Sequence, residues 1–126
     1  MKLSEFAGYD GLGLAELIRR RDVTAKEIGR CVLAGIEICN PRLNAIIETY
    51  ADAVEGLSEV PTLAPFYGLP TLTKDFPIEA ERPAEFGSAL ARGYKATYDH
   101  GFWRKLKGAG LVNIGRTTSS EFGIAA

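Results

Sequence analysis

The sequence predicts an α/β fold, because helical and strand patterns alternate along a chain of ordinary globular composition. Its 126 residues have a hydrophobic share of 46% and a charged share of 25%, as is usual for globular domains. Hydrophobic periodicity gives the order helix, helix, strand, strand, helix, strand. This order is typical of a layered α/β architecture. We therefore expect one domain, or part of a larger one.

A short helix is predicted near the start of the chain. Asp10 is placed to cap it, and the run Arg19–Arg21 to end it in solvent. Its apolar face would consist of Leu14, Leu17 and Ile18.

A longer helix follows. Thr24 and Glu27 have the spacing of a capping box, and we expect Asn40-Pro41 to end the helix. Its apolar stripe is formed by Ile28, Cys31, Val32, Gly35, Ile36 and Cys39. The two cysteines are eight residues apart, about 12 Å along a helix, so no disulfide is expected. With one histidine in the chain, no cysteine–histidine metal site is expected either, and we interpret both cysteines as core residues.

Two strands are predicted in the middle of the chain. Residues 44–50, NAIIETY, form the first, and residues 67–76, YGLPTLTKDF, form the second. Residues 51–66 between them indicate a helix fragment and an exposed connection, and residues 77–88 are expected to be irregular.

A third helix and a short buried strand complete the predicted elements. Asp99 is placed to cap this helix, which would bury Phe102, Trp103 and Leu106 and end at Gly108–Gly110. Residues 111–115, LVNIG, form the strand. Because the sequence stops soon afterwards at SSEFGIAA, we expect the sheet to be incomplete in this chain.

Charge and motifs exclude several classes of function. Fifteen basic and sixteen acidic residues give a net charge of −1, so neither a nucleic-acid surface nor a polybasic membrane surface is expected. No apolar run reaches membrane-spanning length and no hydrophobic signal core opens the chain, which favours a cytoplasmic location. Glycine motifs for phosphate binding are absent. No cofactor and no metal are therefore expected.

Most potential catalytic groups have an ordinary structural explanation. His100 beside Asp99 is expected at an exposed helix start. The acidic residues Glu79, Glu81 and Glu85 lie in a predicted loop without apolar neighbours to separate their pKa values. The pair Ser119-Ser120 is expected to cap a helix. Lys74 is the residue that remains.

Lys74 stands at the end of a largely apolar strand. A lysine acts as a general base when burial or a nearby positive charge lowers its pKa, and a strand end offers a rigid backbone beside a cleft. Strand alternation sends Asp75 to the opposite face, so Asp75 is not its evident counter-ion. Composition alone favours a solvated strand end over a catalytic base, and both interpretations stay open at this point.

Several motifs, in order, give the chain a family resemblance. YGLPTLTKD resembles the G-x-P-x-x-x-K-D segment of the amidase signature hydrolases, which use a serine–cis-serine–lysine triad. Residues 15–44 resemble the N-terminal helical pair of that family. Further similar segments are Gly87–Leu90, Leu106–Gly110, Val112–Thr117 and Ser120–Phe122. Their order and spacing together make the resemblance specific.

The resemblance implies a partial amidase-signature fold, in which the helical pair precedes strands of a mixed sheet flanked by helices. Residues 1–126 would be the N-terminal portion of a single domain, truncated before the Gly/Ser-rich nucleophile segment. Lys74 matches the catalytic lysine of the family, the base that draws a proton through the cis-serine from the attacking serine. The implied activity is hydrolysis of a small-molecule carboxamide, with both serines supplied downstream, and the isolated chain would be inactive.

Three features depart from the family pattern. Arg116 and Thr118 stand where the family more often has Lys and Asn, and residues 84–86 replace a threonine-rich approach to Gly87-Ser88. The largest departure is the absence of the Gly/Ser-rich segment that supplies both serines in the family. The alternative to an amidase is a non-catalytic small α/β binding or interaction protein, or the product of a truncated gene.

The expected protein partners are a second copy of this chain, in a homo-oligomer, or a complementing chain that supplies the missing part of the domain.

Overall fold

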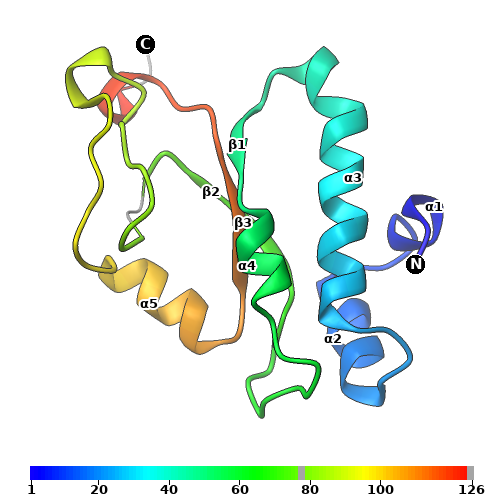
Figure 1. The fold of residues 1–126 in the computed structure, drawn as a ribbon. Coiled ribbons are helices and arrows are strands. Elements are labelled where there is room, and N and C mark those ends of the chain that lie inside the picture. Colours follow the sequence, from blue (N-terminus) through cyan, green and yellow to red (C-terminus); the bar gives the residue numbers. More distant parts are fainter. Residues whose placement is uncertain (77–78, 125–126) are drawn as a thin grey trace.

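The computed structural model describes residues 1–76 and 79–124 (Figure 1). The helices are α1 (Leu3–Phe6), α2 (Gly11–Arg20), α3 (Ala25–Leu43), α4 (Ala51–Glu55) and α5 (Gly101–Gly108), with 3₁₀ turns η1 (Ala89–Ala91) and η2 (Glu121–Gly123). The strands are β1 (Ile46–Thr49), β2 (Pro70–Lys74) and β3 (Val112–Thr117). The predicted helices and strands occur in the predicted order, with α4 as the expected helix fragment; the short helix α1 was not predicted.

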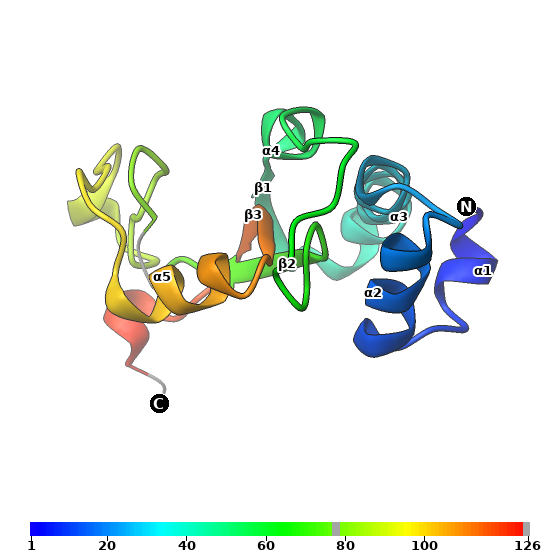
Figure 2. The ribbon, with the colours of Figure 1, turned by 90° about the horizontal axis from the view of Figure 1, so that it is seen from below.

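The three strands form one mixed sheet in the order β1-β3-β2. The central strand β3 pairs antiparallel with β1 and parallel with β2. Figures 1 and 2 show α3 and α5 on opposite sides of this sheet, so the expected α/β fold with flanking helices is confirmed. Because β2 and β3 are parallel, their carboxyl ends lie at the same edge.

The first two predicted helix starts, at Asp10 and Thr24, are confirmed by their hydrogen bonds. The Asp10 carboxylate accepts a hydrogen bond from the Gly13 N–H at 2.7 Å. The Thr24 hydroxyl accepts one from the Glu27 N–H at 3.1 Å, and the Glu27 carboxylate accepts one from the Thr24 N–H at 2.8 Å. These side chains satisfy N–H groups that have no partner within a helix.

The predicted end of the long helix is wrong by one turn. Helix α3 continues through Pro41 to Leu43, and Asn44 caps it with a left-handed φ of 48°. The Asn40 side chain bonds to the residues that follow the helix: its oxygen accepts from the Ala45 and Ile46 N–H groups, and its amide donates to the Ile46 carbonyl. These bonds fasten the helix end to β1.

The expectation for the cysteines is correct for one of them. Both thiols are free, as predicted, but Cys31 is buried whereas Cys39 is exposed. Cys39 lies near the end of α3, where the apolar stripe borders an open pocket between α1 and α3 instead of a packed core.

The third helix differs from its prediction in its first turn. His100, not Asp99, is the N-cap residue, and its Nδ1 accepts from the Phe102 N–H at 3.3 Å. Asp99 instead accepts from the Ala80 N–H and pairs with Lys107. Trp103 is buried as expected, but Phe102 is 55% exposed.

The main hydrophobic core lies between the helical pair and the start of β2. Its buried members are Leu14, Ile18, Val23, Ala25, Ile28 and Leu69. No described helix combines the length and apolar character needed to cross a membrane. Of the segment predicted to be irregular, residues 77–78 lie outside the described residues, and residues 79–88 contain no helix or strand beyond an isolated Pro83–Lys95 bridge.

Candidate active site

Lys74 is the last residue of β2 and its side chain is exposed at the carboxyl edge of the sheet. Its Nζ donates a hydrogen bond of 3.3 Å to the Thr118 carbonyl oxygen, just beyond the end of β3. Thr73 and Asp75 on either side are buried, so the predicted strand alternation is confirmed. Ligands of open α/β sheets bind outside the carboxyl ends of strands, which makes this a suitable place for a reactive side chain.

Asp75 is buried directly behind Lys74, with 2% of the residue exposed. One carboxylate oxygen accepts from the Glu85 N–H at 2.9 Å and the other from the Gly87 N–H at 2.8 Å. The oxygen facing Glu85 also lies 2.5 Å from Arg116 Nη1. Asp75 therefore joins the end of β2 to residues 85–87 and to β3.

Arg116 is the buried centre of a cluster with three carboxylates. In addition to the contact with Asp75, the Arg116 Nη2 lies 2.8 Å from a Glu85 carboxylate oxygen, and the Arg116 Nε lies 3.2 Å from a Glu48 carboxylate oxygen. Burial by itself disfavours the charged guanidinium, but the hydrogen bonds to Glu85 and Asp75 outweigh it and raise the pKa of Arg116. The pKa of Glu85 is lowered, mainly by the hydrogen bond from the Gly93 N–H and to a smaller extent by the hydrogen bond from Arg116. Arg116 and Glu85 therefore favour their charged forms as an ion pair. We name the group of Arg116, Asp75, Glu85 and Glu48 the Arg116 cluster.

Strand register explains why these groups meet. Arg116 lies opposite Glu48 in β1 and opposite Thr73 in β2. Cross-strand partners share a face of the sheet, and Asp75 follows Thr73 by two residues, so it lies on that face as well. Lys74, whose partner in β3 is Thr117, belongs to the opposite face.

Residues 85–88 and the turn η2 pack together beside the cluster, as Figure 1 shows for the upper left of the molecule. The Phe122 N–H donates to the Phe86 carbonyl at 2.7 Å, and Ser88 Oγ donates to Glu121 at 2.6 Å. Phe86 and Phe122 have left-handed φ values of 54° and 49°, which bulky residues rarely adopt. Such backbone strain clusters at functional sites.

Among the described residues, none of the other side chains considered from sequence is hydrogen-bonded to Lys74 Nζ, whose partner is the Thr118 carbonyl. His100 caps α5, and Glu79 accepts from the Asn113 amide at 2.7 Å. Ser120 is the N-cap residue of η2 without a side-chain cap bond, and Ser119 Oγ is buried without a hydrogen-bond partner among the described residues. Within the described ranges, no group of three His, Cys, Asp or Glu side chains could hold a metal ion.

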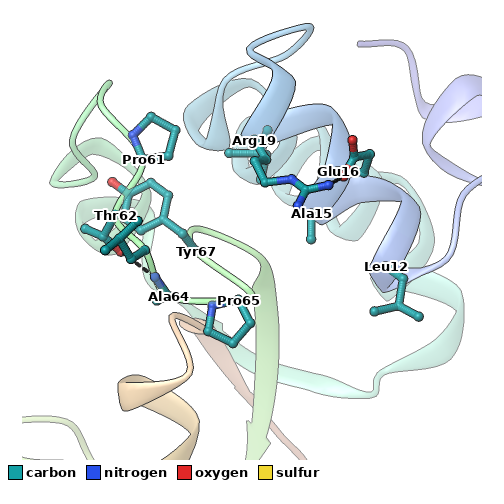
Figure 3. A pocket seen from close by; sticks show the side chains of 11 residues that line it. Leu12, Ala15, Glu16, Arg19, Pro61, Thr62, Ala64, Pro65 and Tyr67 are labelled. Carbon is teal, nitrogen blue, oxygen red and sulfur yellow. Dashed lines mark hydrogen bonds and ion pairs between the residues drawn. The ribbon is translucent and has the colours of Figure 1, made fainter.

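A pocket of about 590 Å³ lies between α2 and the connection that precedes β2 (Figure 3). Leu12, Ala15, Glu16 and Arg19 line one wall, and Pro61, Ala64, Pro65 and Tyr67 line the other. Glu16 and Arg19 pair with each other on α2. The lining includes neither Lys74 nor any member of the Arg116 cluster, so this pocket is separate from the candidate site.

The Arg116 cluster was missed from sequence, although one signal was available. Residues 112–117 form a central strand that is buried at four consecutive positions from Asn113 to Arg116. A buried arginine requires a counter-charge, and Arg116 directly follows the buried strand predicted over residues 111–115, so its place in the sequence indicated acidic partners. Their identity depends on strand register, which the sequence leaves open.

Comparison with known proteins agrees with this architecture. The chain is 29% identical over 117 residues to the 6-aminohexanoate-cyclic-dimer hydrolase of Paenarthrobacter ureafaciens, covering 90% of this chain and 24% of that protein. It is 28% identical over 117 residues to the 6-aminohexanoate-cyclic-dimer hydrolase of a Pseudomonas species, again covering 90% and 24%.

The chain also resembles a solved amidase structure. The peptide amidase of Stenotrophomonas maltophilia superposes with a TM-score of 0.80 at 26% identity, covering 93% of this chain and 26% of that structure. The chain thus spans about a quarter of the length of the relatives it matches. Residues 27–126 match the model of the Amidase family. The chain belongs to the amidase family.

Proposed function

We propose that the protein to which this chain contributes hydrolyses a small linear or cyclic carboxamide, and that Lys74 is its general base. The observation that carries the proposal is the position of Lys74, exposed at the carboxyl end of β2 in a chain of the amidase family. The names of two relatives, a cyclic-dimer hydrolase and a peptide amidase, are consistent with cleavage of an amide bond.

The chemistry requires a base because a serine hydroxyl is a weak nucleophile. Neutral Lys74 would accept a proton relayed through one serine from a second serine as that second oxygen attacks the amide carbon. Backbone N–H groups would stabilise the tetrahedral oxyanion. Collapse of this intermediate expels ammonia or an amine and leaves an acyl-enzyme, which water then cleaves to the acid. The two serines would come from the rest of the domain, or from a complementing chain.

Substitution of Lys74 in the intact amidase that contains this segment tests the proposal. We expect Lys74→Ala to lower kcat for a simple carboxamide by several orders of magnitude, because the serine loses its base, while thermal unfolding stays near that of the parent. Lys95→Ala is the matched control, since Lys95 is also an exposed lysine, and it should retain full activity. Normal turnover in Lys74→Ala would refute the assignment of the base.

A further inference from the structure

We propose that Asp75 and Arg116 are positioning residues for Lys74, a role that rests on the proposed function. The first reason is that Lys74 has little side-chain support of its own. Among the described residues, the partner of its Nζ is a backbone carbonyl at 3.3 Å, at the long end of the hydrogen-bond range. The direction of the amine therefore depends on how firmly the ends of β2 and β3 are held relative to each other.

The Arg116 cluster supplies that fixation. Asp75 is bonded covalently to Lys74, and its carboxylate is held by the Arg116 guanidinium and by two backbone N–H groups. Arg116 belongs to β3, one residue before the register partner of Lys74 and two before the carbonyl that Lys74 binds. The ion pair thus connects the two strand ends between which the Lys74 side chain lies.

The Asp75 carboxylate also holds the backbone of residues 85–87, which packs against residues 119–122. We call these two segments the wall beside the base. By accepting from the Glu85 and Gly87 N–H groups, Asp75 fixes the backbone that contacts residues 119–122. Gly87 packs so closely that an added Cβ would lie 2.6 Å from the Ser119 carbonyl oxygen. A displaced Asp75 would therefore move both Lys74 and this wall.

Stability alone is a weak explanation for such a cluster. Desolvation of buried ion pairs often cancels their Coulombic gain, so that apolar replacements of similar volume can be equally stable. An arrangement of one guanidinium and three carboxylates adds geometric specificity, because the planar guanidinium binds in fixed directions. A fixed geometry is what a base needs, since a small misplacement can cost up to about 100-fold in rate.

The test compares kcat, KM and thermal unfolding of variants in the intact amidase, at a temperature where each variant is folded. We expect Asp75→Asn and Arg116→Met to lower kcat by about 10- to 100-fold with little change in KM. Arg116→Lys, which keeps the charge, should lose less than Arg116→Met. Ile18→Ala is the control for destabilisation, because it removes a buried side chain of α2 and should lower the unfolding temperature without lowering kcat.

A second arm asks whether Asp75 acts through Lys74. Residues that act as a unit are not additive, so Asp75→Asn should change the residual rate of Lys74→Ala by less than about twofold. Fully additive losses would overturn the positioning role, as would a folded Asp75→Asn enzyme with normal kcat.

Two further outcomes are distinguishable. If Asp75→Asn and Arg116→Met do not fold, Glu85→Gln removes one outer arm of the cluster and should still lower kcat; normal kcat in that variant would contradict the inference. If Lys74→Ala itself keeps full activity, the assignment of Lys74 as the base in the proposed function fails, and Asp75 and Arg116 then have no base to position.

Discussion

Two consecutive residues show how strongly position decides chemistry. Lys74 is exposed with one weak contact, whereas Asp75 is buried and makes two backbone hydrogen bonds and an ion pair. Strand alternation predicted their opposite faces, because that depends on local geometry alone. The partner of Asp75 could not be predicted, because Arg116 lies 41 residues further along the chain and meets it only through the register of β2 and β3.

Gly87 allows a prediction at the residue scale. It has a φ of +65°, and a Cβ there would lie 2.6 Å from the Ser119 carbonyl oxygen. Gly93 has a similar φ of +79° with nothing within 4 Å of an added Cβ. Both Gly87→Ala and Gly93→Ala incur the left-handed penalty of about 1–2 kcal/mol, but Gly87→Ala should cost about 1–3 kcal/mol more because of the clash.

Denaturant unfolding of the two glycine variants measures this difference. Equal losses in unfolding free energy would mean that residues 85–88 do not pack against residues 119–120 as described.

At the scale of elements, the starts of α2 and α3 were predictable, whereas the first turn of α5 and the end of α3 were not. The capping box of Thr24 and Glu27 needs only a spacing of three residues, and it forms as predicted. Pro41 normally disfavours a helix interior, but α3 continues through it to Leu43, and Asn40 makes three hydrogen bonds to residues 45–46 at this end. Those bonds require β1 to return beside the helix, which is a tertiary effect that local sequence does not encode.

The capping box predicts a pH dependence of stability. The pKa of Glu27 is lowered from its ordinary value of 4.5, mainly by the hydrogen bond from the Thr24 N–H and to a smaller extent by the one from the Thr24 hydroxyl. The folded state thus binds a proton less readily than the unfolded state, so the contribution of ionised Glu27 is present above pH 4.5 and is lost as the pH falls through the lowered pKa. We expect Glu27→Gln, which keeps an acceptor, to cost about 0.3–1 kcal/mol at pH 7 and low salt.

The measurement is the difference in unfolding free energy between the parent and Glu27→Gln as the pH is lowered. The difference should shrink below pH 4.5. Glu37→Gln on the exposed face of the same helix is the control, and an identical pH profile in that variant would remove the role of the capping box.

At the scale of the whole molecule, the fold class and the mixed sheet were predictable, because motif order and resemblance carry them. The amount of uncovered apolar surface was not predictable in detail. Leu43 and Ile38 on α3 are 70% and 67% exposed, and Leu43 also lines an apolar pocket of about 280 Å³ between α1 and α3. Each outer strand, β1 and β2, has one neighbour within the described residues, and such edges invite pairing with another chain.

We predict that the isolated 126-residue polypeptide has no amidase activity. No hydroxyl group of the described residues is hydrogen-bonded to Lys74 Nζ, whose partner is a carbonyl oxygen, so the proposed base has no hydroxyl partner among them. Release of ammonia or acid from simple amides measures this directly. Activity of the isolated polypeptide that Lys74→Ala abolishes would contradict the prediction.

The Arg116 cluster has a consequence for how the sheet is assembled. Its carboxylates come from β1, from the end of β2 and from the following loop, and they converge on one guanidinium of the central strand. A slip of β3 by one residue would turn Arg116 to the opposite face and leave Asp75 buried without its cation, at a cost of several kcal/mol. The cluster therefore makes the observed strand register more stable than shifted pairings, including those that apolar side chains alone would tolerate.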